Sequence, residues 1–142
     1  MKFPAKVSSF ILLVVVLSSF AEAKKFDNCS LAKALLSQGF AKTDLKNWVC
    51  LVQNESGKDT TKKNNNRNGS TDWGLFQIND RWWCDPQDKA KKTHNECKVK
   101  CSDLLTDDIT KAATCAKKVF KRHGFNAWYG WINHCQNKSL PD

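Results

Sequence analysis

Seven cysteines in a chain of 142 residues limit the possible folds more than any other feature of this sequence. In a small secreted protein, so many cysteines indicate a framework of disulfides that supports a modest hydrophobic core. Cys97 and Cys101, with His94 nearby, could instead suggest a zinc site, but no second close pair of cysteine or histidine residues is present. Because seven is odd, at least one thiol has no partner within the chain. The spacing alone does not tell which cysteines pair.

Residues 1–23 have the features of a secretory signal peptide. Lys2 and Lys6 provide the positively charged start, residues 10–17 form an apolar stretch, and Ala21-Glu22-Ala23 ends it with small residues where a signal peptidase would cut. The apolar stretch is too short to span a bilayer, and no longer one follows. We therefore expect a secreted, extracellular protein without a membrane span.

The expected mature chain, residues 24–142, has a size that suits one compact domain. The whole sequence carries a formal charge of +9, and removing Lys2, Lys6 and Glu22 with the leader leaves +8. Such a charge favours anionic partners such as bacterial envelopes, although a basic surface that merely keeps the protein soluble is the plainer alternative. No Lys/Arg-rich block or nucleic-acid motif occurs, so nucleic acid is not expected as a physiological partner. We expect a monomer.

Two segments have the apolar spacing of helices. In the first, which Thr43 can cap, apolar residues recur at i, i+3, i+4 and i+7: Leu45, Trp48, Val49 and Val52. The second is the clearest helix in the sequence. It is expected to begin with Thr106 as its N-cap, to carry Asp107 and Asp108 in its first turn, and to end at Gly124.

Between these helices, a stretch from Asn68 to Cys84 has the features of a small hairpin. Asn68-Gly69 predicts a two-residue turn, because both residues tolerate positive φ. Gly74, within the β-prone arm that follows, would let another backbone or a ligand come close. The fold class is therefore expected to be α+β, with a small antiparallel β-hairpin sub-domain inserted between Glu55 and Cys84.

The same stretch carries side chains that suit a sugar ligand. Asp72 lies near the amides Gln77 and Asn79, and two adjacent indoles follow, Trp82 and Trp83. Neighbouring residues of an extended chain point to opposite sides, so at least one of these indoles is expected to be exposed. An exposed indole offers a flat apolar face to a sugar ring, and amides can bind its hydroxyls. The alternative is that these aromatic residues only close a core.

Glu55 and Asp72 are the two carboxylates of interest. Glu55 falls at the C-terminal end of a predicted helix, where the negative end of the helix dipole disfavours an anion. An apolar wall such as Trp128 would raise the pKa of Glu55 further, and a carboxyl group that stays protonated near neutral pH can act as a general acid. Asp72, among polar side chains, would stay ionised. Such a pair across a sugar-binding cleft is typical of a glycoside hydrolase, whereas most Glu/Asp pairs are simply solvated surface residues.

A set of short motifs is spread along the chain: Asn47-Trp48-Val49-Cys50, Glu55-Ser56, Asn68-Gly69-Ser70-Thr71-Asp72, Gly74-Leu75-Phe76-Gln77-Ile78-Asn79, Arg81-Trp82-Trp83-Cys84, Cys101-Ser102-Asp103-Leu104-Leu105, Asp108-Ile109-Thr110 and Asn126-Ala127-Trp128. Together they resemble the chicken-type (c-type) lysozymes, and most of all the insect members of that family. The resemblance covers essentially all of residues 24–142. It implies a lysozyme-like fold whose active-site cleft lies between a helical domain and the β-hairpin sub-domain.

The resemblance also implies an activity, for which lysozyme is the standard two-carboxylate example. The substrate would be peptidoglycan, cut with retention at the β-1,4 bond between N-acetylmuramic acid and N-acetylglucosamine. Glu55 would protonate the glycosidic oxygen and later activate water, and Asp72 would be the nucleophile or the stabiliser of the transition state. The sugar-binding residues that it implies are Gln77, Asn79, Trp82, Trp83, Ala127 and Trp128. No cofactor is expected, and the basic charge favours antibacterial defence over digestion.

The family's disulfide pattern carries over as Cys50–Cys135, Cys84–Cys101 and Cys97–Cys115. The pattern would also pair Cys29 with a cysteine near the C-terminus, which this sequence lacks. The sequence is then either a truncated copy or a protein that has lost this bridge. In both cases Cys29 is expected to be unpaired.

The related α-lactalbumins and calcium lysozymes bind Ca²⁺ through positions that fall here on Asp103, Thr106, Asp108, Lys111 and Ala112. Of the usual side-chain carboxylates only Asp108 survives, and Lys111 adds a repelling charge, so no metal site is expected. α-Lactalbumins also lack the glutamate found here at position 55, which argues against a regulator of lactose synthase. The rival hypothesis is a lysozyme-fold protein that binds glycans or bacterial surfaces without cleaving them. The presence of both carboxylates favours the enzyme.

Overall fold

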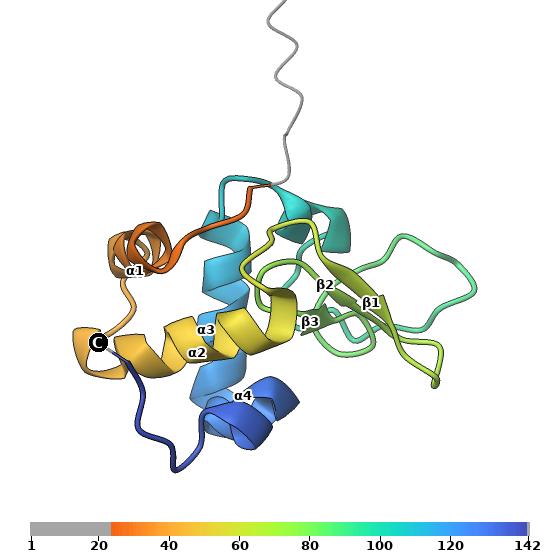
Figure 1. The fold of residues 1–142 in the computed structure, drawn as a ribbon. Helices are drawn as coiled ribbons and strands as arrows, with labels where there is room; N and C mark the ends of the chain where they lie inside the picture. The colour runs from red at the N-terminus through yellow and green to blue at the C-terminus, as the bar shows by residue number, and fades with distance from the viewer. Residues whose placement is uncertain (1–23, 142) are drawn as a thin grey trace, which may run out of the picture.

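The computed structural model describes residues 24–141, so the expected signal peptide lies outside the described residues. The α-helices in this part of the chain are α1 (Asn28–Ser37), α2 (Leu45–Ser56), α3 (Thr110–His123) and α4 (Tyr129–His134). Figure 1 shows the helices gathered on one side of the molecule and the strands on the other. The predicted α+β fold is confirmed. Across residues 24–141, no helix is both long and apolar enough to cross a membrane.

The strands β1 (Lys63–Asn65), β2 (Thr71–Trp73) and β3 (Ile78–Asn79) form one antiparallel sheet in the order β1-β2-β3. The two-residue turn predicted at Asn68-Gly69 is wrong. Asn65 lies opposite Thr71, so residues 66–70 connect the first two strands. Gly69 does have a positive φ of 85°. The Asn68 side-chain oxygen instead accepts hydrogen bonds from the N–H and the hydroxyl of Ser70, which favours a wider loop.

Helix α2 carries the centre of the hydrophobic core. Trp48 and Val52 are buried as the spacing predicted, and Leu51 joins them. Leu45 and Val49 are only partly buried against the core. The Trp48 ring contacts the rings of Phe40, Phe76, Phe120, Phe125 and Trp128. Because Phe76 comes from the segment between β2 and β3, this cluster fixes the sheet to the helices.

Both helix starts differ from the sequence prediction. Thr43 lies in a short 3₁₀ turn, Lys42–Asp44, and does not cap α2. Helix α3 begins at Thr110 rather than just after Thr106. Asp108 explains the later start of α3, because its carboxylate accepts hydrogen bonds from both the N–H and the hydroxyl of Thr110. Short polar side chains can hold a turn in this way in place of a helical first turn.

Three disulfides hold these parts together, and they are the three pairs that the resemblance implies: Cys50–Cys135, Cys84–Cys101 and Cys97–Cys115. The first joins α2 to the residue that follows α4, and the last joins the loop after the sheet to α3. Cys29 is free and exposed.

Gly74 makes the close backbone approach that the sequence predicted. A Cβ at this position would lie 2.0 Å from the carbonyl oxygen of Leu104, and the φ of Gly74 is +76°. Leu104 belongs to the 3₁₀ helix Cys101–Leu105. The sheet therefore packs against this segment at backbone distance, which only glycine allows.

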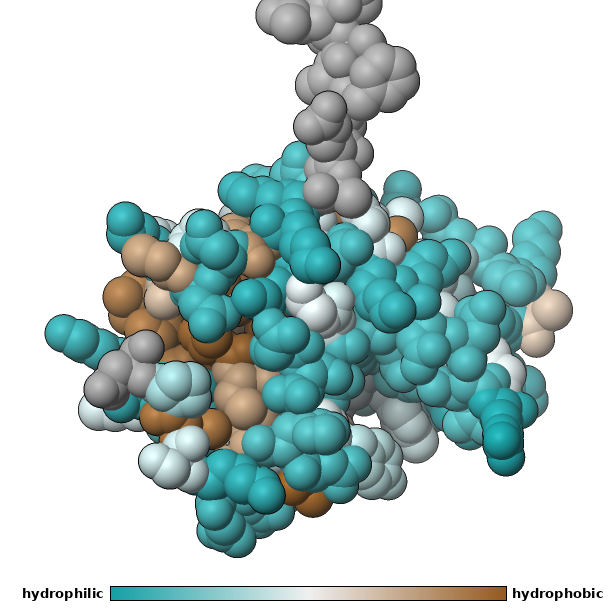
Figure 2. All heavy atoms as spheres, viewed as in Figure 1, coloured by the Kyte–Doolittle hydropathy of each residue, from teal (hydrophilic) through white to brown (hydrophobic). Residues whose placement is uncertain are grey.

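The two sides of the molecule also differ in surface character. In the view of Figure 2, apolar residues gather over α1 and α2, while the strands and the long loop beside them are almost entirely hydrophilic. Leu36 of α1, at 42% exposure, is one of the large apolar residues that lie at the surface of the described chain.

Candidate active site

A cleft of about 1060 Å³ lies between the helices and the sheet. Its walls come from the end of α2, the sheet with its connecting loops, the end of α3 and the start of α4. The cleft brings together every catalytic and sugar-binding candidate named from the sequence: Glu55, Asp72, Gln77, Asn79, Trp82, Trp83, Ala127 and Trp128. These residues are spread over more than half of the described chain, so the fold has to gather them.

Glu55 lies in the last turn of α2, which ends at Ser56. Gly57 follows in the left-handed region, with φ 62°, and turns the chain away towards the sheet. The carboxylate of Glu55 accepts a hydrogen bond of 2.8 Å from the N–H of Gly130 in the first turn of α4. A Cβ on Gly130 would lie 2.9 Å from that oxygen, so the absence of a side chain allows the close contact.

The surroundings of Glu55 favour its protonated form. Burial raises the pKa of Glu55 above that of an ordinary glutamate, and this is the largest effect. The hydrogen bond from Gly130 opposes it, since an N–H donor stabilises the anion, and the negative charge of Asp72 adds to the increase. The net effect is a raised pKa, as a general acid requires. The further expectation that Trp128 covers Glu55 stays a prediction.

Asp72 lies on β2, the central strand, and is held in a polar environment. Its two carboxylate oxygens accept one hydrogen bond each, from the side-chain amides of Asn79 at 2.8 Å and Asn66 at 3.0 Å. Both amides also contact the hydroxyl of Ser70, so the three residues form one network around the carboxylate. Hydrogen bonds from amide donors stabilise a negative charge and fix its position.

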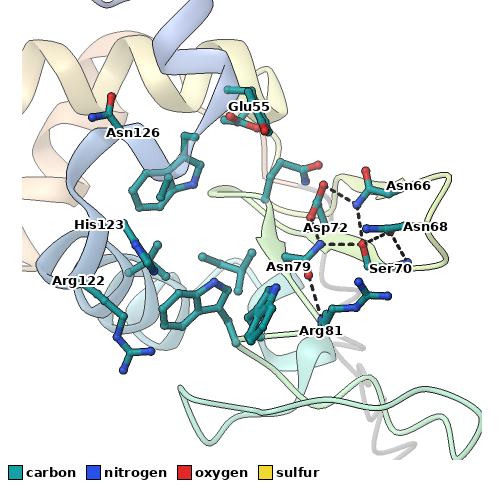
Figure 3. Close-up of a pocket in the computed structure, with 18 of the residues that line it drawn as sticks. Glu55, Asn66, Asn68, Ser70, Asp72, Asn79, Arg81, Arg122, His123 and Asn126 are labelled. Atoms are coloured by element: carbon teal, nitrogen blue, oxygen red, sulfur yellow. Dashed lines mark hydrogen bonds between the residues drawn. The ribbon is translucent and has the colours of Figure 1, made fainter.

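The two carboxylates face the cleft from different walls. In Figure 3, Glu55 comes from the helical side, while Asp72 lies with Asn66, Ser70 and Asn79 on the sheet side. They are close enough for the charge of Asp72 to raise the pKa of Glu55. The site therefore offers an acid on one side of the cleft and a hydrogen-bonded carboxylate on the other. A pair in these two states can cleave a glycosidic bond.

The neighbouring indoles have different environments. Trp82 is 51% exposed, whereas Trp83 is only 8% exposed. The ring of Trp83 lies beside two residues at the end of α3, with the Arg122 guanidinium 5.2 Å and the His123 ring 5.9 Å from its centre. The prediction that at least one indole is exposed is confirmed, and Trp82 is the one that presents a broad face.

The remaining sugar-binding candidates contribute in different ways to the cleft surface. Gln77 donates both of its amide hydrogen bonds to backbone carbonyls, those of Lys62 and Gly74, and so leaves only its side-chain oxygen for a ligand. Trp128 is buried, and its indole N–H donates to the carbonyl of Phe76. Ala127 is exposed at the end of a 3₁₀ turn. Their roles in sugar binding stay predictions.

Several cleft residues were not found by sequence reasoning. Asn66 donates to Asp72 and to the hydroxyl of Ser70, and both residues lie in a loop whose form was predicted wrongly. Tyr129 is 80% exposed and lines the cleft next to Gly130, the partner of Glu55. Arg122, in the last turn of α3, lines the cleft as well. No local pattern distinguishes such residues before the fold places them.

The segment that corresponds to the calcium site of related proteins does not suit a cation. The ammonium group of Lys111 lies 3.2 Å from the carboxylate of Asp103, where a cation would have to bind. Asp108 uses its carboxylate within its own turn. Within residues 24–141, no group of three or more His, Cys, Asp or Glu residues could hold a metal. The absence of a calcium site stays a prediction.

Comparison with known proteins agrees with the geometry of the cleft. The family model of the C-type lysozyme/alpha-lactalbumin family matches residues 24–142. The chain is 60% identical to the lysozyme of Bombyx mori over 132 residues, which are 93% of each chain. It is 54% identical to lysozyme c-1 of Anopheles gambiae over 135 residues, 95% of this chain and 94% of that one. It is also 46% identical to the tracheal lysozyme C of Bos taurus over 134 residues, 92% and 90% of the two chains. With both carboxylates facing one cleft and matches of this extent, the chain belongs to the C-type lysozyme/alpha-lactalbumin family.

Proposed function

We propose that this protein is a secreted antibacterial glycoside hydrolase, a lysozyme that cleaves the β-1,4 bond between N-acetylmuramic acid and N-acetylglucosamine in peptidoglycan. The observation that carries the proposal is the pair Glu55 and Asp72. Burial raises the pKa of Glu55, and two amides hold Asp72 across the same cleft. The relatives named lysozyme support the same activity.

The geometry supports one order of events. Glu55, protonated, donates its proton to the glycosidic oxygen, and the bond to the leaving sugar breaks. Asp72, whose position is fixed by Asn66 and Asn79, stabilises the positive charge that develops on the remaining sugar or forms a bond to it. Glu55, now ionised, takes a proton from water, which attacks the same carbon. The product keeps the configuration of the substrate.

The site does not fit an α-lactalbumin, the other kind of protein in the family name. The matched family includes α-lactalbumins, which lack the glutamate that is Glu55 here. A lysozyme-fold protein that only binds glycans remains the rival, because the exposed Trp82 would serve either function. The basic charge of the chain supports attraction to anionic bacterial surfaces, and the features of residues 1–23 support secretion.

One assay separates the enzyme from its rival. Wild-type protein and the Glu55→Gln variant are added to a suspension of bacterial cell walls, and the fall in turbidity is followed. Wild-type protein should clear the suspension, whereas Glu55→Gln should lose at least about a hundredfold in rate, because glutamine has the same shape but no proton to donate. Glu96→Gln is the matched control, since it makes the same substitution at a partly exposed glutamate that pairs with Arg122.

The outcomes are distinct. Glu96→Gln should lyse cell walls nearly as well as wild type, and Glu55→Gln should still bind oligomers of N-acetylglucosamine. Lysis that persists in Glu55→Gln would reject Glu55 as the acid. Wild-type protein that binds the oligomers without lysing cell walls would instead establish the rival binding function.

A further inference from the structure

Trp82 is held in the cleft by different contacts from those of its neighbour. Trp83 is buried in the core, next to the end of α3. Trp82, at 51% exposure, is one of three large apolar residues that lie exposed within the described chain, with Leu36 and Tyr129. A side chain this exposed is not fixed by core packing. Something else has to hold the indole if it is to meet a sugar in one orientation.

The imidazole of His94 stacks on the indole of Trp82. The ring centres are 4.6 Å apart and the ring planes differ by only 6°. Trp82 lines the cleft, whereas His94 lines a separate shallow hollow with Arg81, Lys92 and Thr93. The imidazole covers one face of the indole and does not line the cleft, so the opposite face of the indole is left for a ligand.

The backbone around His94 is tied to the segment that carries Trp82. The N–H of His94 donates to the carbonyl of Arg81 at 2.8 Å, and the N–H of Glu96 donates to the carbonyl of Trp82 at 2.9 Å. The hydroxyl of Thr93 donates to the carbonyl oxygens of Asp80 and Cys84. These bonds bracket His94 on both sides, so the imidazole has a fixed base from which to support the indole.

We propose that His94 is a positioning residue for sugar binding. Its imidazole stacks on one face of the Trp82 indole and fixes the orientation of that ring, so that a sugar ring can stack on the other face. The proposal rests on the proposed function and adds one residue to it, from a loop in which the sequence analysis found no sugar-binding candidate. His94 itself does not touch the sugar.

The physical reason is preorganisation. An exposed indole that can rotate has to be immobilised when the sugar binds, and that ordering reduces the affinity. Because the indole stacks on His94, most of this ordering is already present in the protein before the sugar binds. The interaction of one aromatic pair corresponds to a factor of about 3–10 in the dissociation constant. The effect should therefore fall on sugar binding rather than on the chemical step.

The test measures binding of the trimer of N-acetylglucosamine by calorimetry, with every variant made in the Glu55→Gln protein so that no hydrolysis occurs. His94→Ala should raise the dissociation constant by about 3–10-fold. His94→Phe, which keeps a flat ring, should restore most of the affinity. Lys92→Ala, which alters the same hollow without touching the stack, should bind like the parent. With native Glu55, His94→Ala should raise KM much more than it changes kcat.

A double-mutant cycle gives the sharpest result. In a Trp82→Ala background the indole is gone, so His94→Ala should have no further effect on the dissociation constant. The proposal is wrong if His94→Ala binds the trimer like the parent, if His94→Phe binds as weakly as His94→Ala, or if the loss persists without the indole. Lysis of cell walls by the wild-type protein is measured separately. An absence of lysis together with the expected binding cycle would reject the hydrolase but not the role of His94.

Discussion

The cleft has a helical wall, formed by α2 and α4 and carrying Glu55, and a sheet wall, formed by the strands with their loops and carrying Asp72. The two walls hold their carboxyl groups in different ways. Glu55 is at the end of a helix, is partly buried, and has one hydrogen bond from a backbone N–H. Asp72 is on the central strand and is held by the side-chain amides of Asn66 and Asn79. Burial disfavours the charged form of a carboxyl group, whereas hydrogen-bond donors favour it.

The two walls give two carboxyl groups in one cleft different surroundings. The helical wall supplies a partly buried position, because α2 and α4 pack closely where Gly130 has no side chain. The sheet wall supplies donors, because its loop and its strands are rich in asparagine. Each of the following changes is made in one of the two walls.

The largest effect is expected when the carboxyl group of Asp72 on the sheet wall is replaced. Asp72→Asn should reduce the rate of hydrolysis by about 10²–10³-fold, since the positive transition state loses its electrostatic partner. The charge of Asp72 also contributes to the raised pKa of Glu55, so the alkaline limb of the remaining activity should move to lower pH. Initial rates on a soluble oligosaccharide across a range of pH measure both effects.

Asp88→Asn is the matched control for this change, because Asp88 is exposed and lies outside the cleft. It should leave both the rate and the pH profile as they are. An alkaline limb that stays in place in Asp72→Asn would mean that the two carboxylates do not interact through their charges.

The next effect concerns how the sheet wall is attached. Gly74→Ala should lower the free energy of unfolding by about 3 kcal/mol, because the new Cβ would collide with the carbonyl of Leu104 and alanine disfavours a positive φ. Gly69→Ala is the matched control, with a φ of +85° but no atom within 4 Å of the added Cβ. Urea unfolding of both variants measures the difference. Equal losses would show that backbone strain alone, and not the contact with Leu104, makes glycine necessary at position 74.

The smallest effect concerns the helical wall and depends on pH. The folded protein binds the Glu55 proton more tightly than the unfolded chain does, because the pKa of Glu55 is raised on folding. Wild-type stability should therefore fall, relative to Glu55→Gln, as the pH rises from the ordinary pKa of a glutamate through the raised one. Melting temperatures of the two proteins between about pH 3 and about pH 8 should converge at the acidic end and separate in favour of the variant above it.

Glu96→Gln again serves as the control. Glu96 is partly exposed and pairs with Arg122, so this change should not reproduce the same pH dependence. Wild-type protein that stays as stable as Glu55→Gln across the whole range would contradict the raised pKa.

Local patterns predicted the parts of the fold that depend on one segment at a time. The apolar spacing predicted α2 with Trp48 and Val52 inside, and the two adjacent indoles predicted at least one exposed ring, which is that of Trp82. The same kind of reasoning failed where side chains compete with the backbone. Asn68 accepts hydrogen bonds from Ser70 and widens the predicted turn, and Asp108 delays the start of α3 by bonding to Thr110.

The candidate site was predicted in part, and for two different reasons. Glu55 and Asp72 were named from the chemistry of helix ends and polar strands, but their pairing came from the resemblance to c-type lysozymes. Asn66 and Tyr129 were missed as residues of the cleft, and His94 was missed as the partner of Trp82. Asn66 donates to Asp72 from the loop before β2, and His94 stacks on Trp82 from a later loop, and no local spacing predicts such contacts.

The order of residues was enough to predict the family, the α+β class and Glu55 and Asp72 as the two candidate carboxyl groups, because each prediction depends on residue type and on short-range spacing. The states of the two carboxylates depended on the fold. The N–H of Gly130 reaches Glu55 from 75 residues away, and the amide of Asn79 reaches Asp72 from the neighbouring strand. The stack of His94 on Trp82 likewise needed the loop to fold back over the segment before it. Burial and hydrogen bonding depend on which groups lie in contact. Contacts between groups that are distant in the sequence form only when the helices, the sheet and the disulfides pack together.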